Sequence, residues 1–449
     1  MNPGELDPHR DPLAYVRHHA PWLCAAELGT CIVGSHALAI ACRRASVAGP
    51  TPKDLDLAWA LDVDTGRAVL EQHGAFVPTT TGNLDRGTLA VRVGDLRVEL
   101  TTLRAGTPSM PLHQRIECDL EARDMTCGAV AIEVSTGKVH DPQHGLADWR
   151  ARKVVPVGDV RARVEEHPVR WLRYDRKARE WGFELDRSVR KLALSPTLFD
   201  ALPREAVATE LRAALLQCDS PGRFFVELFE ANLLQHLLPE LALQFDGRSA
   251  GPQRWHPELS QGLHLVLSLE WAAEHSRGLD DRDRLAVLVA VLCHDLGKGY
   301  TRDHELPSHP GHEGLGLAPL ATMLDRFPGL ADQRCRWLAA KVCELHLLAR
   351  RLRELRPGTL ASLYDQHFRA KDSPLQLFAL AVAADVAGRL GEAASGEPER
   401  VRVLSELQQL RTCCESVDAT SLRAQFDDVE AFKAALHAAR ARAIAASFF

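Results

Sequence analysis

The chain has 449 residues, of which 46% are hydrophobic and 25% charged, and its formal net charge at pH 7 is −6. These values are typical of globular proteins with more than one domain, and they exclude a disordered or fibrous chain. The net acidity also excludes a protein that coats nucleic acid with its whole surface, because phosphate binding depends on lysine and arginine. Any contact with RNA must come from a local basic patch.

The first 17 residues are polar and lack the apolar run that a secretory signal requires. No uninterrupted apolar run long enough to cross a membrane follows them. The eleven cysteines are scattered and form no CxxC pair. We therefore expect reduced thiols, a cytoplasmic location and no membrane span.

Residues 31–133 alternate short strand-like runs with glycine and aspartate turns, which predicts a mixed α/β head. The runs are CIVG, DLDLAWAL, LAVRV, LRVELTTL and GAVAIEV. After Pro156 the pattern changes to long amphipathic helical segments that continue to the C-terminus. The fold class is therefore an α/β head followed by a mostly α-helical neck and an α-helical domain.

A stretch rich in glycine, proline and serine, FDGRSAGPQRWHPE at 245–258, is the best linker candidate within the helical part. It separates the neck from the last domain. The predicted domains are the head at 1–157, a helical neck with RNA-binding potential at 158–245, and a helical domain with its tail at 246–449.

Carboxylates on two predicted strands of the head form a candidate metal site. Asp54 and Asp56 alternate along one strand, so both side chains leave the same face, and Glu99 joins them if the strands pair. Three carboxylates suit the two metals of nucleotidyl transfer. The preceding turn, with Gly34 and Ser35, offers backbone N–H groups to phosphate where a strand enters a helix. Alternatively, the Asp-x-Asp pair is an ordinary surface feature of a strand edge.

Ten basic residues crowd one helical stretch of the predicted neck. This stretch is either an RNA-binding patch or a solvated helix face covered by ion pairs. The residues are Arg161, Arg163, Arg170, Arg173, Arg176, Lys177, Arg179, Arg187, Arg190 and Lys191.

The order of these segments resembles the bacterial tRNA nucleotidyltransferases, that is, the CCA-adding enzymes and their poly(A) polymerase relatives. The similar segments are IVGSHALAIACRR, PKDLDLAWA, DRGTLAV, VELTTLR, ARDMTCGAVAI, HDPQHGLADWRARKV and EEHPVRWLRYDRKAREWGFEL. The resemblance implies a palm-type head that transfers nucleotides from CTP and ATP to the 3′ end of tRNA or another RNA with Mg²⁺. It implies metal binding by Asp54 and Asp56, with Glu99 completing the catalytic set. It also implies nucleotide binding by Gly34, Ser35, Arg104, Arg123, Asp124, Arg170 and Arg173.

The chain departs from the family pattern at five positions. Ser35 replaces a second glycine of the phosphate turn, and Leu38 and Ala39 replace an Arg-Asp pair. His167 stands where an aspartate pairs with the base-reading arginine, and Gly128 replaces an asparagine. A neutral imidazole does not offer the acceptors of a carboxylate. Two alternatives therefore stay open: a degenerate head that only binds RNA, and a transferase with an acceptor other than tRNA.

A buried helix in the last domain is predicted to end in a His-Asp pair. The segment RLAVLVAVLCHDLGKGY is apolar up to His294 and Asp295, which need a partner or a metal when buried. His264 and Asp385 lie in two other apolar helical segments. Together these side chains form a mixed nitrogen and oxygen site for Mg²⁺, Mn²⁺, Ni²⁺ or Co²⁺. Each residue could instead be a hydrogen-bonded polar group of the core.

The order of these four residues resembles the HD phosphohydrolase domain. The segments CHDLGKG, SHPGHE, ELH and ADVAGRLGE are similar to the version fused to some CCA-adding enzymes. This resemblance implies metal-dependent hydrolysis of 2′,3′-cyclic phosphates, 2′-nucleotides or other phosphomonoesters. It implies that His309, His312 and His346 line the site or hold a second metal, unless they are surface histidines. Lys298 either neutralises phosphate charge or caps the helix.

Overall fold

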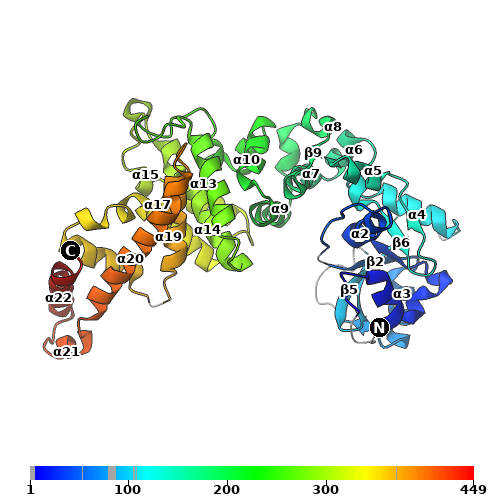
Figure 1. Cartoon of the computed structure of the whole chain (residues 1–449), viewed down its shortest axis with the longest axis horizontal. Coiled ribbons are helices and arrows are strands. Elements are labelled where there is room, and N and C mark those ends of the chain that lie inside the picture. Colours follow the sequence, from blue (N-terminus) through cyan, green and yellow to red (C-terminus); the bar gives the residue numbers. More distant parts are fainter. Residues whose placement is uncertain (1–5, 53, 79–86, 105–106, 108, 371) are drawn as a thin grey trace. The chain divides into compact units, whose positions relative to one another are not determined.

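The structure is a computed structural model that divides into two compact units. It describes residues 6–52, 54–78, 87–104, 107, 109–370 and 372–449. The first unit comprises 1–178 with 182–192, and the second comprises 179–181 with 193–449. The first unit contains the sheet and the second is helical (Figure 1). This confirms the predicted fold class, while the division into head, neck and last domain stays a prediction.

A seven-stranded mixed sheet, in the order β3-β4-β5-β2-β1-β6-β7, forms the centre of the first unit. β2 and β5 run parallel, and the other neighbouring pairs are antiparallel. A separate parallel pair joins β8 and β9. The strands are β1 Cys31–Val33, β2 Asp56–Trp59, β3 Phe76–Val77, β4 Thr88–Val93, β5 Leu96–Thr102, β6 Ala131–Glu133, β7 Val139–His140, β8 Lys153–Val154 and β9 Glu184–Leu185.

Some helices of the first unit begin or end at residues with recognisable capping chemistry. The side chains of Asp62 and Asp159 accept hydrogen bonds from the first turns of α3 and α6, as N-caps do. Gly182 ends α7 in the left-handed conformation, which glycine adopts at little cost. The helices are α1 Pro12–His19, α2 Gly34–Arg44, α3 Val63–Gln72, α4 Leu112–Glu121, α5 Gly145–Arg150, α6 Val160–Glu166, α7 Val169–Trp181 and α8 Arg187–Arg190.

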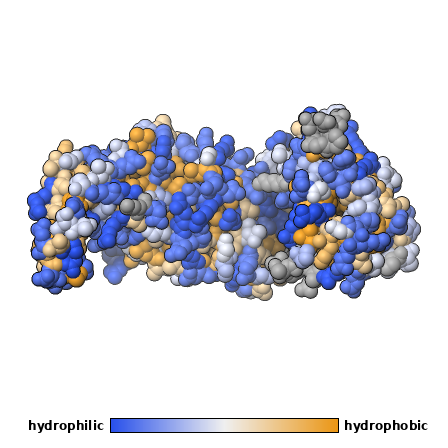
Figure 2. All heavy atoms as spheres, turned by 90° about the horizontal axis from the view of Figure 1, so that it is seen from below, coloured by the Kyte–Doolittle hydropathy of each residue, from blue (hydrophilic) through white to orange (hydrophobic). Residues whose placement is uncertain are grey.

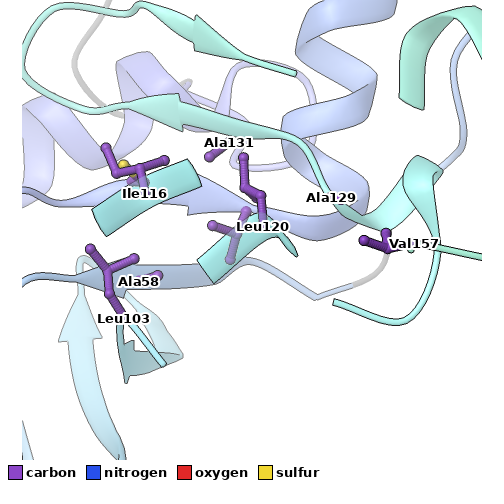
Figure 3. Packing of buried hydrophobic residues seen from close by; sticks show 9 residues of the cluster. Ala58, Leu103, Ile116, Leu120, Ala129, Ala131 and Val157 are labelled. Atoms are coloured by element: carbon purple, nitrogen blue, oxygen red, sulfur yellow. The ribbon is translucent and has the colours of Figure 1, made fainter. Parts of the chain in front are cut away.

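The core between α4 and the central strands determines which part of the sheet stays open. Ile116 and Leu120 of α4 pack on Ala58 of β2 (Figure 3). Ala58 follows Asp56 on the same face of β2, because side chains alternate along a strand. α4 therefore covers the Ala58 end of this face and leaves the Asp56 end half-buried. The buried members of this cluster are Cys31, Val33, Ala58, Leu103, Ile116, Leu120, Ala129, Ala131 and Val157.

Four helices, α13, α14, α17 and α19, pack against one another at the centre of the second unit. α14 is buried from Leu285 to Cys293, and α19 is buried almost throughout. Helices that are apolar on all sides belong inside a core, as the sequence predicted. The helices are α9 Arg204–Gln217, α10 Pro221–Glu230, α11 Leu234–Leu237, α12 Pro239–Ala242, α13 Gln261–His275, α14 Asp281–Cys293, α15 His312–Leu315, α16 Leu317–Arg326, α17 Gln333–Ala349, α18 Pro357–Leu363, α19 Leu375–Ala387, α20 Gly396–Glu415, α21 Ala419–Arg423 and α22 Val429–Ser447.

Hydrophilic residues cover most of the molecular face in Figure 2, and apolar residues form separate patches between them. Within the described residues, no helix combines the length and apolarity needed to cross a membrane. All eleven cysteines are free thiols, as expected.

Candidate functional sites

The sheet brings the three predicted carboxylates of the head to one place. Asp56 begins β2 and is the register partner of Glu99 on the parallel strand β5, while Asp54 lies two residues before it. All three line a cavity of about 460 Å³. His9 and Arg97 line the same cavity and were missed from the sequence, because neither belongs to a recognisable motif.

The charges in this cavity fit a divalent cation. Burial, together with the charges of Glu99 and Asp54, raises the pKa of Asp56 to about 6, and the charge of Arg123 acts in the opposite direction. Carboxylates that repel one another in this way gain most from a shared cation. Gly34, with a φ of +67°, lies beside them, and a Cβ there would be 3.5 Å from Asp56 Oδ2. The turn therefore keeps space next to the carboxylates.

The predicted phosphate turn leads from β1 into the N-terminus of α2. Gly34 and Ser35 are the first two residues of α2 and are half-buried. Leu38 and Ala39 are buried in the core, 1% and 4% exposed, so this chain uses apolar packing where the family pattern has charges. His36 is also buried, and its Nδ1 lies 2.8 Å from the Asp54 carbonyl oxygen. This contact ties α2 to the segment that carries the aspartates.

Asp119, which the sequence did not single out, organises two of the predicted nucleotide-binding arginines. The backbone N–H of Arg104 donates to Asp119 Oδ1 at 2.9 Å, and Arg123 Nη2 donates to Asp119 Oδ2 at 3.0 Å. Burial lowers the pKa of Arg104, and the charges of Arg123 and Arg170 add to this effect. The three arginines therefore concentrate positive charge in one region of the first unit.

Asp124 contacts α7 through both its side chain and its backbone. Arg173 Nη1 donates to Asp124 Oδ2 at 2.9 Å, and the Tyr174 hydroxyl donates to the Asp124 carbonyl oxygen at 2.9 Å. Asp124 and Arg173 are thus brought together by the fold, although they are far apart in the sequence.

Glu166 is the carboxylate that orients Arg170. Arg170 Nη1 donates to Glu166 Oε2 at 2.5 Å and to the Arg163 carbonyl oxygen at 3.0 Å. The hydrogen bond from Arg170 lowers the pKa of Glu166. The His167 side chain is 61% exposed, and its Nε2 lies 4.0 Å from Glu166 Oε1. The preceding glutamate therefore holds the arginine, although an aspartate is missing at 167.

Ion pairs engage part of the basic stretch of the neck, which leaves both interpretations of that stretch open. Their carboxylate partners are Glu165, Glu166, Asp124 and Glu227. The basic residues concerned are Arg161, Arg163, Arg170, Arg173 and Arg179.

In the second unit, the four predicted metal ligands meet in the core. His264 comes from α13, His294 and Asp295 follow α14, and Asp385 comes from α19. His264 Nε2 lies 3.4 Å from His294 Nε2 and 3.3 Å from Asp385 Oδ1. His294 Nε2 lies 3.2 Å from Asp295 Oδ2. All four side chains are buried.

Two further histidines face the other oxygen of Asp295. His312 Nε2 lies 3.2 Å and His346 Nε2 lies 3.6 Å from Asp295 Oδ1. Asp295 Oδ1 and His312 Nε2 are buried and close together, but neither makes a hydrogen bond of good geometry among the described residues, a state that a metal ion would relieve. His309 is different, because its ring nitrogens contact Ser249 and Thr301. All three histidines are buried, so the surface interpretation was wrong.

The two aspartates of this cluster are ionised in spite of their burial. Burial would raise the pKa of Asp295, but His294 and Lys298 hold it well below its usual value. Asp385 is likewise buried, and His264 together with Arg350 holds its pKa well below the usual value. Burial lowers the pKa of His346 to about 4. Burial would lower the pKa values of His264 and His312, but the neighbouring carboxylates outweigh burial and raise both, so a metal ion would have to displace a proton from these imidazoles. Ionised carboxylates together with imidazole nitrogens are a donor set for a transition metal or Mg²⁺.

A second layer of side chains orients these candidate ligands. The fully buried carboxylate of Glu258 lies 3.2 Å from His264 Nδ1 and 2.7 Å from His256 Nδ1. Gln261 Nε2 donates to Asp295 Oδ2 at 3.0 Å. A carboxylate on the far nitrogen of a histidine fixes its ring and tautomer. Sequence reasoning missed these residues, although the His-x-Glu spacing of WHPE was a possible signal.

Lys298 is buried beside the same carboxylate. Its Nζ lies 2.7 Å from Asp295 Oδ2 and donates to the Ala250 carbonyl oxygen at 2.7 Å. Lys298 therefore balances the charge of Asp295 in this structure.

Comparisons with known proteins place the chain in a family. Residues 41–155 match the family described as the poly A polymerase head domain. The multifunctional CCA protein of Xanthomonas euvesicatoria pv. vesicatoria is 37% identical over 351 residues, which cover 76% of this chain and 80% of the relative. This chain belongs to the multifunctional CCA protein family. The corresponding protein of Laribacter hongkongensis is 34% identical over 338 residues, covering 74% of this chain and 78% of the relative.

The solved structures agree with this membership at the level of the fold. The Bacillus stearothermophilus CCA-adding enzyme in complex with CTP matches with a TM-score of 0.63 and 19% identity, covering 98% of this chain and 93% of that chain. The family resemblance read from the motifs is thus confirmed, and the chain is a nucleotidyltransferase of this family.

Proposed function

We propose that the head adds nucleotides from CTP and ATP to the 3′ end of tRNA with Mg²⁺. The observation that carries this proposal is the common cavity of Asp54, Asp56 and Glu99, with the last two in register on parallel strands. The names of the curated relatives and the CTP complex of the similar structure support the same activity.

In this proposal, Asp54, Asp56 and Glu99 hold Mg²⁺, which when bound acidifies the attacking hydroxyl and neutralises the triphosphate. The N-terminus of α2, at Gly34 and Ser35, offers backbone N–H groups to a phosphate. Binding of phosphate by these backbone N–H groups does not require charged side chains in α2, where this chain has Leu38 and Ala39.

In the same proposal, arginines supply positive charge near the carboxylates and orient the incoming nucleotide. Arg104 and Arg123, linked through Asp119, place positive charge near the carboxylate cavity, as the effect of Arg123 on Asp56 indicates. Arg97 lines the cavity and can compensate for the charge absent at positions 38 and 39. Arg170, held by Glu166, presents its guanidinium to the base of the incoming nucleotide.

The test is incorporation of each labelled nucleoside triphosphate, with Mg²⁺, into tRNA transcripts that lack none, one, two or three of the terminal nucleotides. We expect ordered addition of C, C and A. Incorporation into a small RNA but not into tRNA would favour the transferase with another acceptor. No incorporation by the parent protein would leave the head as an RNA-binding scaffold.

For the second unit, we propose metal-dependent hydrolysis of phosphate esters at the cluster of His264, His294, Asp295 and Asp385. The arrangement around Asp295 favours this proposal. Its Oδ2 atom faces His294, and its Oδ1 atom faces His312 and His346. A divalent metal, when bound, supplies a Lewis acid for a phosphoryl oxygen and acidifies water. Glu258 and Gln261 orient the ligands, and Lys298 balances the charge of Asp295.

This activity is measured as phosphate release from 2′-nucleotides and ring opening of 2′,3′-cyclic nucleotides, with Mg²⁺, Mn²⁺, Ni²⁺ or Co²⁺. We expect His294→Ala and Asp295→Asn to abolish it and to leave nucleotide incorporation intact. Hydrolysis that survives both substitutions would assign the activity to another site or to a contaminant.

A further inference from the structure

An arginine-rich cavity opens beside the metal cluster of the second unit. Its volume is about 570 Å³, within the range of pockets that hold small ligands. Its wall comes from the segment before α13, the C-terminal end of α17, the residues after α19, and α20. The lining includes Trp255, His256, Arg350, Arg351, Arg389 and Arg402.

Two lining residues connect this cavity directly to the cluster. Arg350 Nη1 lies 3.3 Å from Asp385 Oδ2. On another side, His256 Nδ1 lies 2.7 Å from Glu258 Oε1, and the same oxygen lies 3.2 Å from His264 Nδ1. A ligand in the cavity is therefore separated by one side chain from Asp385 and by two side chains from His264.

The positive charge of the cavity is only partly balanced. Arg402 pairs with Glu399 and Glu406, and Arg350 pairs with Asp385 and Glu399. Within the described part of the chain, no carboxylate oxygen lies within 4.0 Å of the Arg351 or Arg389 guanidinium, and Arg389 Nε is buried without a hydrogen-bond partner. Two guanidinium groups without acidic partners are the usual recognition chemistry of a phosphate.

The same cavity offers an aromatic surface. Trp255 is 55% exposed, which is unusual for so large an apolar side chain, and the Arg254 guanidinium lies over one face of its ring, 5.3 Å from the ring centroid. Nucleotide bases stack on exposed aromatic rings, and each such contact contributes about 1–3 kcal/mol. The combination of unbalanced arginines, an exposed indole and a neighbouring metal cluster matches a ligand that carries both a phosphate and a base.

We propose that this cavity binds the substrate of the hydrolytic site, a phosphorylated nucleotide whose phosphate is held by Arg351 and Arg389 and whose base stacks on Trp255. The inference rests on the proposed hydrolase function, because it names the ligand of the cavity as the substrate of that site. The arginines and Trp255 are positioning residues in it, since the cluster supplies the chemistry. The nucleotide is either free or the terminal residue of an RNA, because both carry the same phosphate and base.

The test measures binding by titration calorimetry to the full chain freed of metal with a chelator. The probes are adenosine 2′-monophosphate and adenosine, which differ only in the phosphate. Arg351→Gln and Arg389→Gln should each weaken binding of the monophosphate about tenfold and leave adenosine unaffected. Trp255→Ala should weaken both ligands. Arg282→Gln, on an arginine with a 66% exposed side chain outside this cavity, is the matched control.

The head also binds nucleotides in the proposed function. Only the part of the calorimetric binding signal that is lost in the Arg351, Arg389 and Trp255 variants is therefore assigned to the cavity. All variants should incorporate nucleotides into tRNA at the parent rate, which shows that they fold. Comparison with a short RNA that ends in a phosphate separates the two ligand sources. A larger loss of affinity for the RNA than for the monophosphate in the arginine variants assigns an RNA terminus, and a loss confined to the monophosphate assigns the free nucleotide.

The outcomes separate this inference from the hydrolase proposal. Unchanged affinity for the monophosphate in the Arg351→Gln/Arg389→Gln double variant overturns the inference, even if the parent protein hydrolyses phosphate esters. Arginine-dependent binding without hydrolysis by the parent supports the cavity and overturns the hydrolase proposal.

Discussion

Asp56 on β2 and Glu99 on β5 are paired in register, so two carboxylates from distant parts of the chain face the same cavity. Their mutual repulsion contributes to the raised pKa of Asp56. An arrangement that is unfavourable for the isolated side chains indicates a site shaped for a cation rather than for stability alone.

Asp56→Asn should lower nucleotide incorporation by about 10³-fold, the equivalent of about 4 kcal/mol, because a proposed metal ligand is lost. The thermal midpoint should not fall below that of the parent, since the substitution removes repulsion with Glu99. Asp64→Asn, on the exposed side of α3, is the control and should transfer nucleotides at the parent rate. Equal incorporation by both variants would show that the metal site was assigned to the wrong residues.

Gly34→Ala should reduce nucleotide transfer through the conformation of the phosphate turn. The residue has a φ of +67°, and alanine in the left-handed region costs about 1–2 kcal/mol. Gly74→Ala is the matched control, because Gly74 has a φ of +60° and an added Cβ there would meet no described atom within 4 Å. We expect similar losses in denaturant unfolding for both variants but a loss of incorporation for Gly34→Ala alone. A matching loss of incorporation in Gly74→Ala would mean that strain, and not the site, is responsible.

Glu166→Gln should weaken the selection of CTP and ATP over UTP and GTP by about tenfold, because Arg170 loses its charged hydrogen-bond partner. Competition between labelled triphosphates during incorporation measures this ratio. Glu165→Gln is the control, since Glu165 pairs with the exposed Arg161 instead. Unchanged selection in Glu166→Gln would assign the orientation of Arg170 to another contact.

Added Mn²⁺ or Ni²⁺ should raise the thermal midpoint of the chain after chelator treatment, because a ligand of the folded state stabilises it by mass action. At a hundredfold excess over the dissociation constant, the gain is about 2.7 kcal/mol. His264→Ala should abolish most of the shift, whereas His236→Ala, on an exposed histidine of α11, should retain it. A full shift in His264→Ala would place the bound metal outside the cluster.

The sequence indicated the residues whose spacing carries a local signal. Asp54 and Asp56 alternate as a strand requires, and an apolar helix leading into His294 and Asp295 marks a buried polar pair. The fold class followed from the change of hydrophobic period after the head, since periodicity reflects secondary structure directly. These patterns also supported the family resemblance that the comparisons confirmed.

Only the tertiary structure identified the partners that complete each site. Asp119 joins Arg104 to Arg123, and Glu258, in the stretch predicted as a linker, is buried against His264. Arg350, at the C-terminal end of α17, contacts Asp385 of α19. Such contacts join segments that are far apart along the chain, so no local period or spacing encodes them. They are decided by which faces pack together, and therefore by the folded core as a whole.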